Sequence, residues 1–156
     1  MKIYNMLRED MIIPDLESRD RDEALREMVS YLKSKNKDIK ENELFEKLLQ
    51  REKLGSTAIG DGVAIPHCKL RNLKNSILLL AVSKHGIDFN SLDNKLSHAL
   101  FLVVSSPDNP SLNLQILAGI AHIVRKAKSL TKKIQNATTR REILDIIREE
   151  EEKLNE

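Results

Sequence analysis

Aromatic residues, cysteine and long apolar runs are scarce in this chain, and each shortage excludes a class of function. Aromatic residues make up 3% of the 156 residues and tryptophan is absent, so few side chains could stack on bases or sugar rings. The single cysteine, Cys68, cannot form an internal disulfide and is typical of a reducing compartment. Apolar runs such as residues 77–82 are too short to span a bilayer, and no signal-peptide pattern is found. We therefore expect a cytoplasmic protein.

A large excess of charge of either sign is also absent. The chain has 26 basic and 24 acidic residues, a net charge of +2, and the two signs are mostly interspersed. This pattern gives little reason to expect a nucleic-acid or membrane surface. The basic residues scattered over residues 126–141 accompany no recognised nucleic-acid-binding module, so we expect no nucleic-acid partner.

The remaining composition suits one globular domain. A chain of 156 residues can enclose one sizeable core, and 40% hydrophobic with 32% charged residues is typical of a folded domain. No internal repeat or linker divides the sequence. We therefore expect residues 1–156 to form a single domain.

Hydrophobic periodicity predicts helices at both ends of this domain and a small sheet between them. Apolar residues at helical spacing and capping residues predict helices after Asp20, over residues 41–53, after Asn109, over residues 130–136 and after Thr139. Residues 1–17 are expected to form a short strand or arm. Leucine-rich and β-branched runs predict strands over residues 63–65, 76–83, 87–89 and 98–105. The predicted fold class is α/β, with a small mixed sheet flanked by helices.

Two sequence features indicate where the strands lie within this sheet. The continuous apolar runs at residues 78–82 and 99–104 predict central strands that are covered on both faces. Pro66 has no N–H to donate to a neighbouring strand, so it should end its strand or lie at a sheet edge. This places His67, the next residue, at the end or edge of the sheet.

The sequence around His67 has the composition that a reactive histidine requires. It reads Gly-Asp-Gly-Val-Ala-Ile-Pro-His-Cys-Lys over residues 60–69. The two glycines allow close approach of the backbone, and Pro66 restricts the chain just before the imidazole. Arg51 and the Ser56-Thr57 pair precede this stretch and could supply a cation and hydroxyl donors.

A further group of donors is expected at the helix that begins after Asn109. Its N-terminus carries free N–H groups and the positive end of the helix dipole, and Asn113 lies in its first turn. A nucleophilic histidine near an arginine, hydroxyl groups and such a helix end suits the transfer of a phosphoryl group. Each part also has an ordinary structural interpretation: Arg51 as a solvated charge, Thr57 as a turn residue, and Asn113 as a plain helix position.

Other reactive residues in the chain favour structural roles. No pair of histidines has the spacing of a helical metal site and no Cys-x-x-Cys occurs, so neither a metal nor a cofactor is expected. Cys68 is interpreted as a partly buried small residue rather than a redox thiol. His85 and His98 are expected at strand ends on the surface. The acidic run after Arg148 is interpreted as a solvated helix end.

One block of the sequence resembles a known family. Arg51-Glu52, then Ser56-Thr57, then residues 60–67 closely resemble the active-site signature of the enzyme IIA domains of the fructose–mannitol–nitrogen class, which belong to the bacterial phosphoenolpyruvate-dependent sugar phosphotransferase system. The order of elements and the Leu-Asn-Leu-Gln-Ile-Leu-Ala segment at residues 112–118 also fit, so the resemblance covers nearly the whole chain. The block around His67 is specific, whereas the flanking helices are not.

This resemblance implies a phosphohistidine carrier with the fructose/mannitol-type enzyme IIA fold. His67 would accept a phosphoryl group from a histidine phosphocarrier, HPr or its nitrogen-branch relative, and pass it to an enzyme IIB domain or use it as a regulatory mark. Arg51 would balance the phosphate charge, and Thr57 matches a threonine near the site. No metal or cofactor is implied, because the histidines exchange the group directly. Membrane association would be indirect, through a permease.

The sequence departs from the family at one position and leaves several alternatives open. The family often has a second histidine where this chain has Asn113, and an amide can donate a hydrogen bond to phosphate but cannot take up a proton. Phosphorylation of His67 is still expected, whereas its rate is open. Fructose- or mannitol-type uptake, nitrogen-type regulation and a non-catalytic interaction protein all remain possible, and the sequence identifies neither the sugar nor the oligomeric state.

Overall fold

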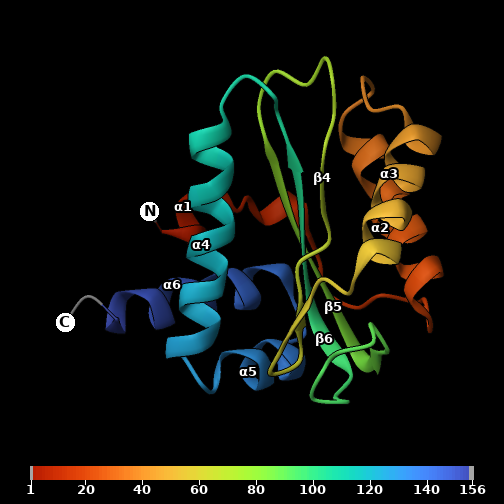
Figure 1. The fold of residues 1–156 in the computed structure, drawn as a ribbon. Helices are drawn as coiled ribbons and strands as arrows, with labels where there is room; N and C mark the ends of the chain where they lie inside the picture. Colours follow the sequence, from red (N-terminus) through yellow and green to blue (C-terminus); the bar gives the residue numbers. More distant parts are fainter. Residues whose placement is uncertain (1, 155–156) are drawn as a thin grey trace.

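Two long strands form the centre of the sheet in the computed structural model, which describes residues 2–154 (Figure 1). Strands β5 (Ile77–Ile87) and β6 (Ser97–Ser105) pair antiparallel, with Leu79 opposite Leu102. The apolar runs at residues 78–82 and 99–104 are buried along their whole length, because helices cover both faces of the sheet. The expectation of two central strands is confirmed.

Four short strands complete a mixed six-stranded sheet. The order is β1-β5-β6-β3-β2, and β4 also pairs with β6. β1 runs parallel to β5, β3 and β4 run parallel to β6, and β2 runs antiparallel to β3. Their bounds are β1 (Ile12–Ile13), β2 (Ala58–Gly60), β3 (Val63–Ala64) and β4 (His67–Lys69). The predicted α/β class with a small mixed sheet is therefore confirmed.

The helices form a layer on each side of the sheet (Figure 1). One layer contains α2 (Arg21–Lys35) and α3 (Glu41–Leu54). The other layer contains the C-terminal helices together with the N-terminal turn of helix. Its members are α1 (Ile3–Met6), α4 (Pro110–Lys126), α5 (Leu130–Asn136) and α6 (Arg140–Lys153), and the 3-10 helix η1 (Glu9–Met11) contacts α6.

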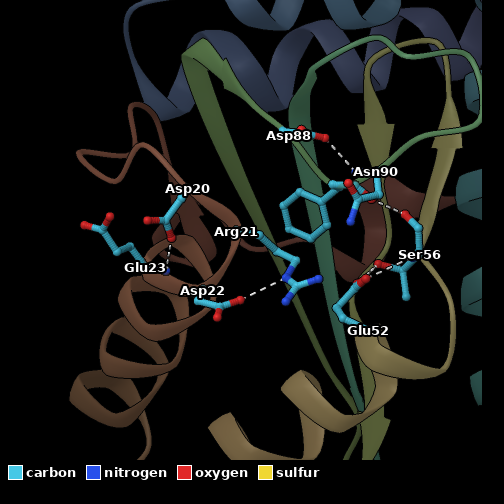
Figure 2. Close-up of polar contacts among 10 residues, drawn as sticks. Asp20, Arg21, Asp22, Glu23, Glu52, Ser56, Asp88 and Asn90 are labelled. Carbon is cyan, nitrogen blue, oxygen red and sulfur yellow. Dashed lines mark hydrogen bonds and ion pairs between the residues drawn. The ribbon is translucent and has the colours of Figure 1, made fainter.

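The predicted capping residues begin these helices. The Asp20 carboxylate accepts a hydrogen bond from the Glu23 N–H at 2.8 Å, as Figure 2 shows, and this bond lowers the pKa of Asp20. Asn109 accepts from the Leu112 N–H at 3.1 Å, followed by a proline at the first helical position. Thr139 caps α6 in the same way. Each cap satisfies an N–H that the helix itself cannot pair.

The structure corrects several expectations about short segments. Residues 87–89 do not form a separate strand, because β5 continues to Ile87 and Phe89 lies in the following loop. β2 and β4 were not predicted, since three-residue strands show no periodicity and depend on pairing with β3 and β6. Residues 1–17 contain the expected short strand, β1, but also the helical turns α1 and η1.

The acidic run after Arg148 is not simply a solvated helix end. Glu150 and Glu151 are each only 6% exposed. Glu150 forms ion pairs with Lys133 and Lys153, and Glu151 accepts hydrogen bonds from the backbone of α1. The expectation was wrong for these two residues because their partners lie on other elements or at the far end of the chain.

Candidate functional site

Pro66 lies between two short strands and brings His67 to the edge of the sheet. β3 ends at Ala64 and β4 begins at His67, and both pair with β6, so the residues between them interrupt one line of pairing. The Pro66 carbonyl accepts a hydrogen bond from the Val103 N–H at 3.0 Å. His67 pairs with Val103, two residues before β6 ends and leads towards α4.

The imidazole of His67 is held in one orientation. Its Nδ1 atom lies 2.7 Å from the carbonyl oxygen of Ile65, and the residue is half-buried. A carbonyl oxygen can only accept, so Nδ1 must carry a hydrogen, and in the neutral ring Nε2 then keeps its lone pair. The ring can therefore act as a nucleophile through Nε2.

The loop after α3 is anchored beside Ile65. The Ile65 N–H donates to the Thr57 carbonyl at 3.0 Å. The Thr57 N–H donates to Glu52 Oε2 at 3.1 Å, and the Thr57 hydroxyl donates to Glu52 Oε1. Thr57 and Glu52 are 5% and 4% exposed. The Thr57 hydroxyl thus faces a buried carboxylate, and its expected position next to the phosphate stays a prediction.

Arg51 lies in the last turn of α3, and Ser56 lies in the loop that follows. One guanidinium nitrogen of Arg51 donates to the Gly55 carbonyl at 2.7 Å. The Ser56 hydroxyl donates to the Phe89 carbonyl, in the loop after β5 (Figure 2). The loop after α3 is thereby fixed to the loop after β5, and the Arg51 side chain beside it is half-exposed.

Asn113 is buried in a network that joins three segments. It is 5% exposed. Its side-chain nitrogen donates to the Ser106 carbonyl at 2.8 Å, and its oxygen accepts from the Ser76 hydroxyl. Ser76 also accepts from the Ser106 N–H at 3.0 Å. Asn113 therefore ties the first turn of α4 to the ends of β5 and β6, and its predicted bond to a phosphate stays untested by this geometry.

The glycines at residues 60 and 62 shape a tight turn between β2 and β3. Their φ angles are +88° and +79°, values that L side chains rarely adopt. A Cβ on Gly62 would lie 3.1 Å from Thr131 Cγ2. The two glycines predicted a close approach of the backbone, and in the structure the backbone approaches other parts of the protein, such as Thr131.

Cys68 lies on the other side of the β4 strand from His67, since successive strand residues point to opposite faces. Burial raises the pKa of the Cys68 thiol to about 12. The nearest charges are Lys47 and Glu43 of α3. Cys68 is therefore a protonated packing residue at neutral pH, in agreement with its interpretation as a partly buried small residue.

The structure joins Thr57 to His67 through Ile65, which hydrogen bonds to both. Arg51 lies in the last turn of α3 and bonds to the Gly55 carbonyl, so its role beside His67 stays a prediction. Asn113 is connected through Ser106, which follows the strand that pairs with His67. The side chains that hold the site and were not assigned roles are Glu52, Ser76 and Ser106. Glu52 belongs to the block that resembles the enzyme IIA signature, which is a signal that could have found it, whereas nothing in the sequence distinguishes the two serines.

No acidic, histidine or cysteine side chains between residues 2 and 154 gather in a group that could hold a metal ion. Within the same residues, no helix has the length and apolar character needed to cross a membrane.

Comparisons with known proteins identify the family of this chain. The chain is 34% identical over 150 residues to a nitrogen regulatory protein of Bradyrhizobium diazoefficiens, covering 94% of this chain and 95% of that protein. It is 30% identical over 147 residues to the PTS system fructose-specific EIIABC component of Bacillus subtilis, of which the chain spans only 23%, with 94% of this chain covered. Its fold matches the crystal structure of nitrogen regulatory protein IIA-Ntr from Neisseria meningitidis with a TM-score of 0.84 at 25% identity, covering 93% of this chain and 98% of that one. Residues 5–150 match the family described as "Phosphoenolpyruvate-dependent sugar phosphotransferase system, EIIA 2", and the chain belongs to this family.

Proposed function

We propose that His67 is the residue through which this phosphotransferase component carries its phosphoryl group, and that the group arrives on Nε2 from an HPr-like histidine phosphocarrier. Members of the EIIA family transfer a phosphoryl group through a histidine. The observation that supports His67 most directly is the 2.7 Å contact between Nδ1 and the Ile65 carbonyl. It leaves Nε2 as the nitrogen with a free lone pair.

The transfer needs no proton to leave His67. The Nε2 lone pair attacks the phosphorus of the donor phosphohistidine, a new N–P bond forms, and the donor N–P bond breaks. The electron pair of the broken bond returns to the donor imidazole. The His67 ring gains positive charge while Nδ1 keeps its hydrogen, so its bond to the Ile65 carbonyl becomes charge-assisted and stronger.

The other site residues support this step in different ways. Arg51 would balance the charge of the phosphate, because a guanidinium can leave the Gly55 carbonyl and form two parallel bonds to phosphate oxygens. Thr57 would act through the hydrogen bond that its carbonyl accepts from the Ile65 N–H. Asn113 would act by holding the first turn of α4, whose N–H groups attract anions.

The acceptor of the phosphoryl group would be an enzyme IIB domain or a regulated target protein. Similarity to a fructose-specific EIIABC component favours the IIB domain. Similarity along 95% of a nitrogen regulatory protein favours a regulated target, and this is the second candidate function. In both cases we propose that the protein acts in the cytoplasm and meets the membrane only through a permease.

The direct test is phosphorylation with purified components. The protein is incubated with phosphoenolpyruvate, enzyme I and HPr, and the label is tested for the acid lability and base stability of phosphohistidine. We expect the wild-type protein and His85→Ala to take up label, because His85 is exposed on β5. His67→Ala should take up none. Label that persists in His67→Ala, or a wild-type protein that accepts none, would contradict the proposal.

A further inference from the structure

Glu52 carries a buried carboxylate next to the loop that leads to His67. It lies in the last turn of α3 and is 4% exposed. Among residues 2–154, no lysine, arginine or histidine forms an ion pair with it. Both of its oxygens instead accept hydrogen bonds from Thr57, one from the N–H and one from the hydroxyl. A carboxylate is costly to bury, so its presence here indicates a specific task.

Glu52 is the first member of a line of hydrogen bonds that ends at the imidazole of His67. Glu52 holds Thr57, whose carbonyl accepts the Ile65 N–H at 3.0 Å. The Ile65 carbonyl then accepts from His67 Nδ1 at 2.7 Å. The first bonds join the end of α3 to the loop that follows it, and this loop to Ile65, so the carboxylate sets the position of a backbone segment rather than that of one side chain.

The far side of the same segment is fixed by the sheet. The residue after Ile65 is Pro66, whose carbonyl accepts the Val103 N–H at 3.0 Å. Ile65 is therefore held by β6 on one side and by Thr57 on the other. The Val103 bond is a ladder bond within the sheet, whereas the Thr57 bond depends on a loop that Glu52 anchors. Loss of Glu52 should free the Ile65 carbonyl on one side only.

We propose that Glu52 is a positioning residue for phosphoryl transfer, which holds the Ile65 carbonyl where it keeps His67 protonated at Nδ1 and presents Nε2. This inference rests on the proposed function of His67. The proposed effect of Glu52 on His67 is on the position of the Ile65 carbonyl. It is not electronic, because the N–H that bonds to Thr57 and the carbonyl that bonds to His67 belong to different peptide groups. A purely structural Glu52 would stabilise the fold and leave the His67 tautomer unchanged.

The first variant is Glu52→Gln, which keeps the size of the side chain. The single amide oxygen can accept from only one of the two Thr57 donors, so one of the two hydrogen bonds to the carboxylate is lost or reversed in direction. Glu46→Gln is the matched control, because Glu46 is exposed on the same helix and the chemical change is identical. Thr57→Ser keeps both donors and serves as the conservative variant.

Two measurements separate positioning from folding. Nitrogen NMR of labelled histidine gives the fraction of His67 with hydrogen on Nδ1, without any phosphoryl donor. Transfer from phosphorylated HPr gives kcat and KM. We expect Glu52→Gln to lower the Nδ1–H fraction and to lower kcat about 10- to 100-fold with little change in KM. Glu46→Gln should match the wild-type protein in both, and Thr57→Ser should keep the wild-type Nδ1–H fraction.

The outcomes test the two proposals separately. A Glu52→Gln protein that melts at a lower temperature but keeps the wild-type tautomer and kcat would overturn the positioning role. A wild-type protein that accepts no phosphoryl group would overturn the proposed function, while the NMR measurement would still decide the role of Glu52. Where Glu52→Gln does not fold, Thr57→Val removes only the hydroxyl bond, and an unchanged tautomer in that variant would equally count against the inference.

Discussion

At the scale of single residues, one carbonyl group decides which nitrogen of His67 can react. Ile65 presents that carbonyl because the proline that follows it favours an extended conformation and permits no N–H donor between Ile65 and the histidine. The neighbouring Cys68 does not compete as a nucleophile, because burial raises its pKa to about 12. The reactivity of this edge of the sheet is therefore confined to Nε2 of the imidazole.

We expect Asn113 to affect the free energy of unfolding more than it affects the uptake of phosphoryl label by His67. Asn113→Ala leaves the Ser106 carbonyl and the Ser76 hydroxyl without their partner, so the free energy of unfolding should fall by about 1–3 kcal/mol. Urea unfolding measures this change, with Gln115→Ala, exposed on the same helix, as the control. Label from HPr should persist in both variants. Equal stability of the two variants would show that the network contributes nothing.

The sequence predicts single residues well where the cause is local. Within residues 60–67, the two glycines and Pro66 indicated His67, because glycine and proline restrict or free the conformation of their own backbone. Asn113 is different, since its partners are brought close by the fold: it contacts Ser76, 37 residues away in the chain. The residue type at this position indicates a polar group, but not which polar groups it meets.

At the scale of helices and strands, long amphipathic or wholly apolar segments were predictable and short ones were not. α2 and β6 follow from their own apolar spacing and match the predicted ranges closely. β4 exists because residues 67–69 pair with β6, and nothing within three residues indicates that partner. The site lies on these short segments, so its arrangement required the structure.

The stabilisation that the contact between α5 and α6 provides should decrease at acid pH, through protonation of Glu150. The hydrogen bond from Lys133 lowers the pKa of Glu150. Because the pKa is lower in the folded state, the pair contributes fully above the ordinary value of 4.5, and this contribution is lost as the pH falls through the folded value. Glu150→Gln should therefore unfold at lower urea than the wild-type protein at neutral pH.

The difference between Glu150→Gln and the wild-type protein should then narrow as the pH falls below about 4.5. Urea midpoints measured across this range, with Glu149→Gln as the exposed control on α6, check the prediction. A difference of constant size at every pH would mean that Glu150 acts through packing and not through its charge.

At the scale of the whole molecule, the two ends of the chain are joined by one side chain. Glu151 of α6 accepts hydrogen bonds from the Ile3 N–H at 2.7 Å and the Tyr4 N–H at 2.8 Å. These two N–H groups belong to the first turn of α1, where the helix has no partners of its own for them. A four-residue helix is too short to be stable alone, so α1 depends on the opposite end of the chain.

Glu151→Ala should release α1 and destabilise the whole domain. The two N–H groups lose their acceptor, and the expected loss is about 1–3 kcal/mol in the free energy of unfolding. Urea unfolding measures that loss, and hydrogen exchange at the Ile3 and Tyr4 amides should become faster than in the wild-type protein. Glu152→Ala, which changes an exposed carboxylate on the same helix, should alter neither. Unchanged exchange at Ile3 in Glu151→Ala would show that α1 is held by its apolar packing alone, since Ile3 is itself fully buried.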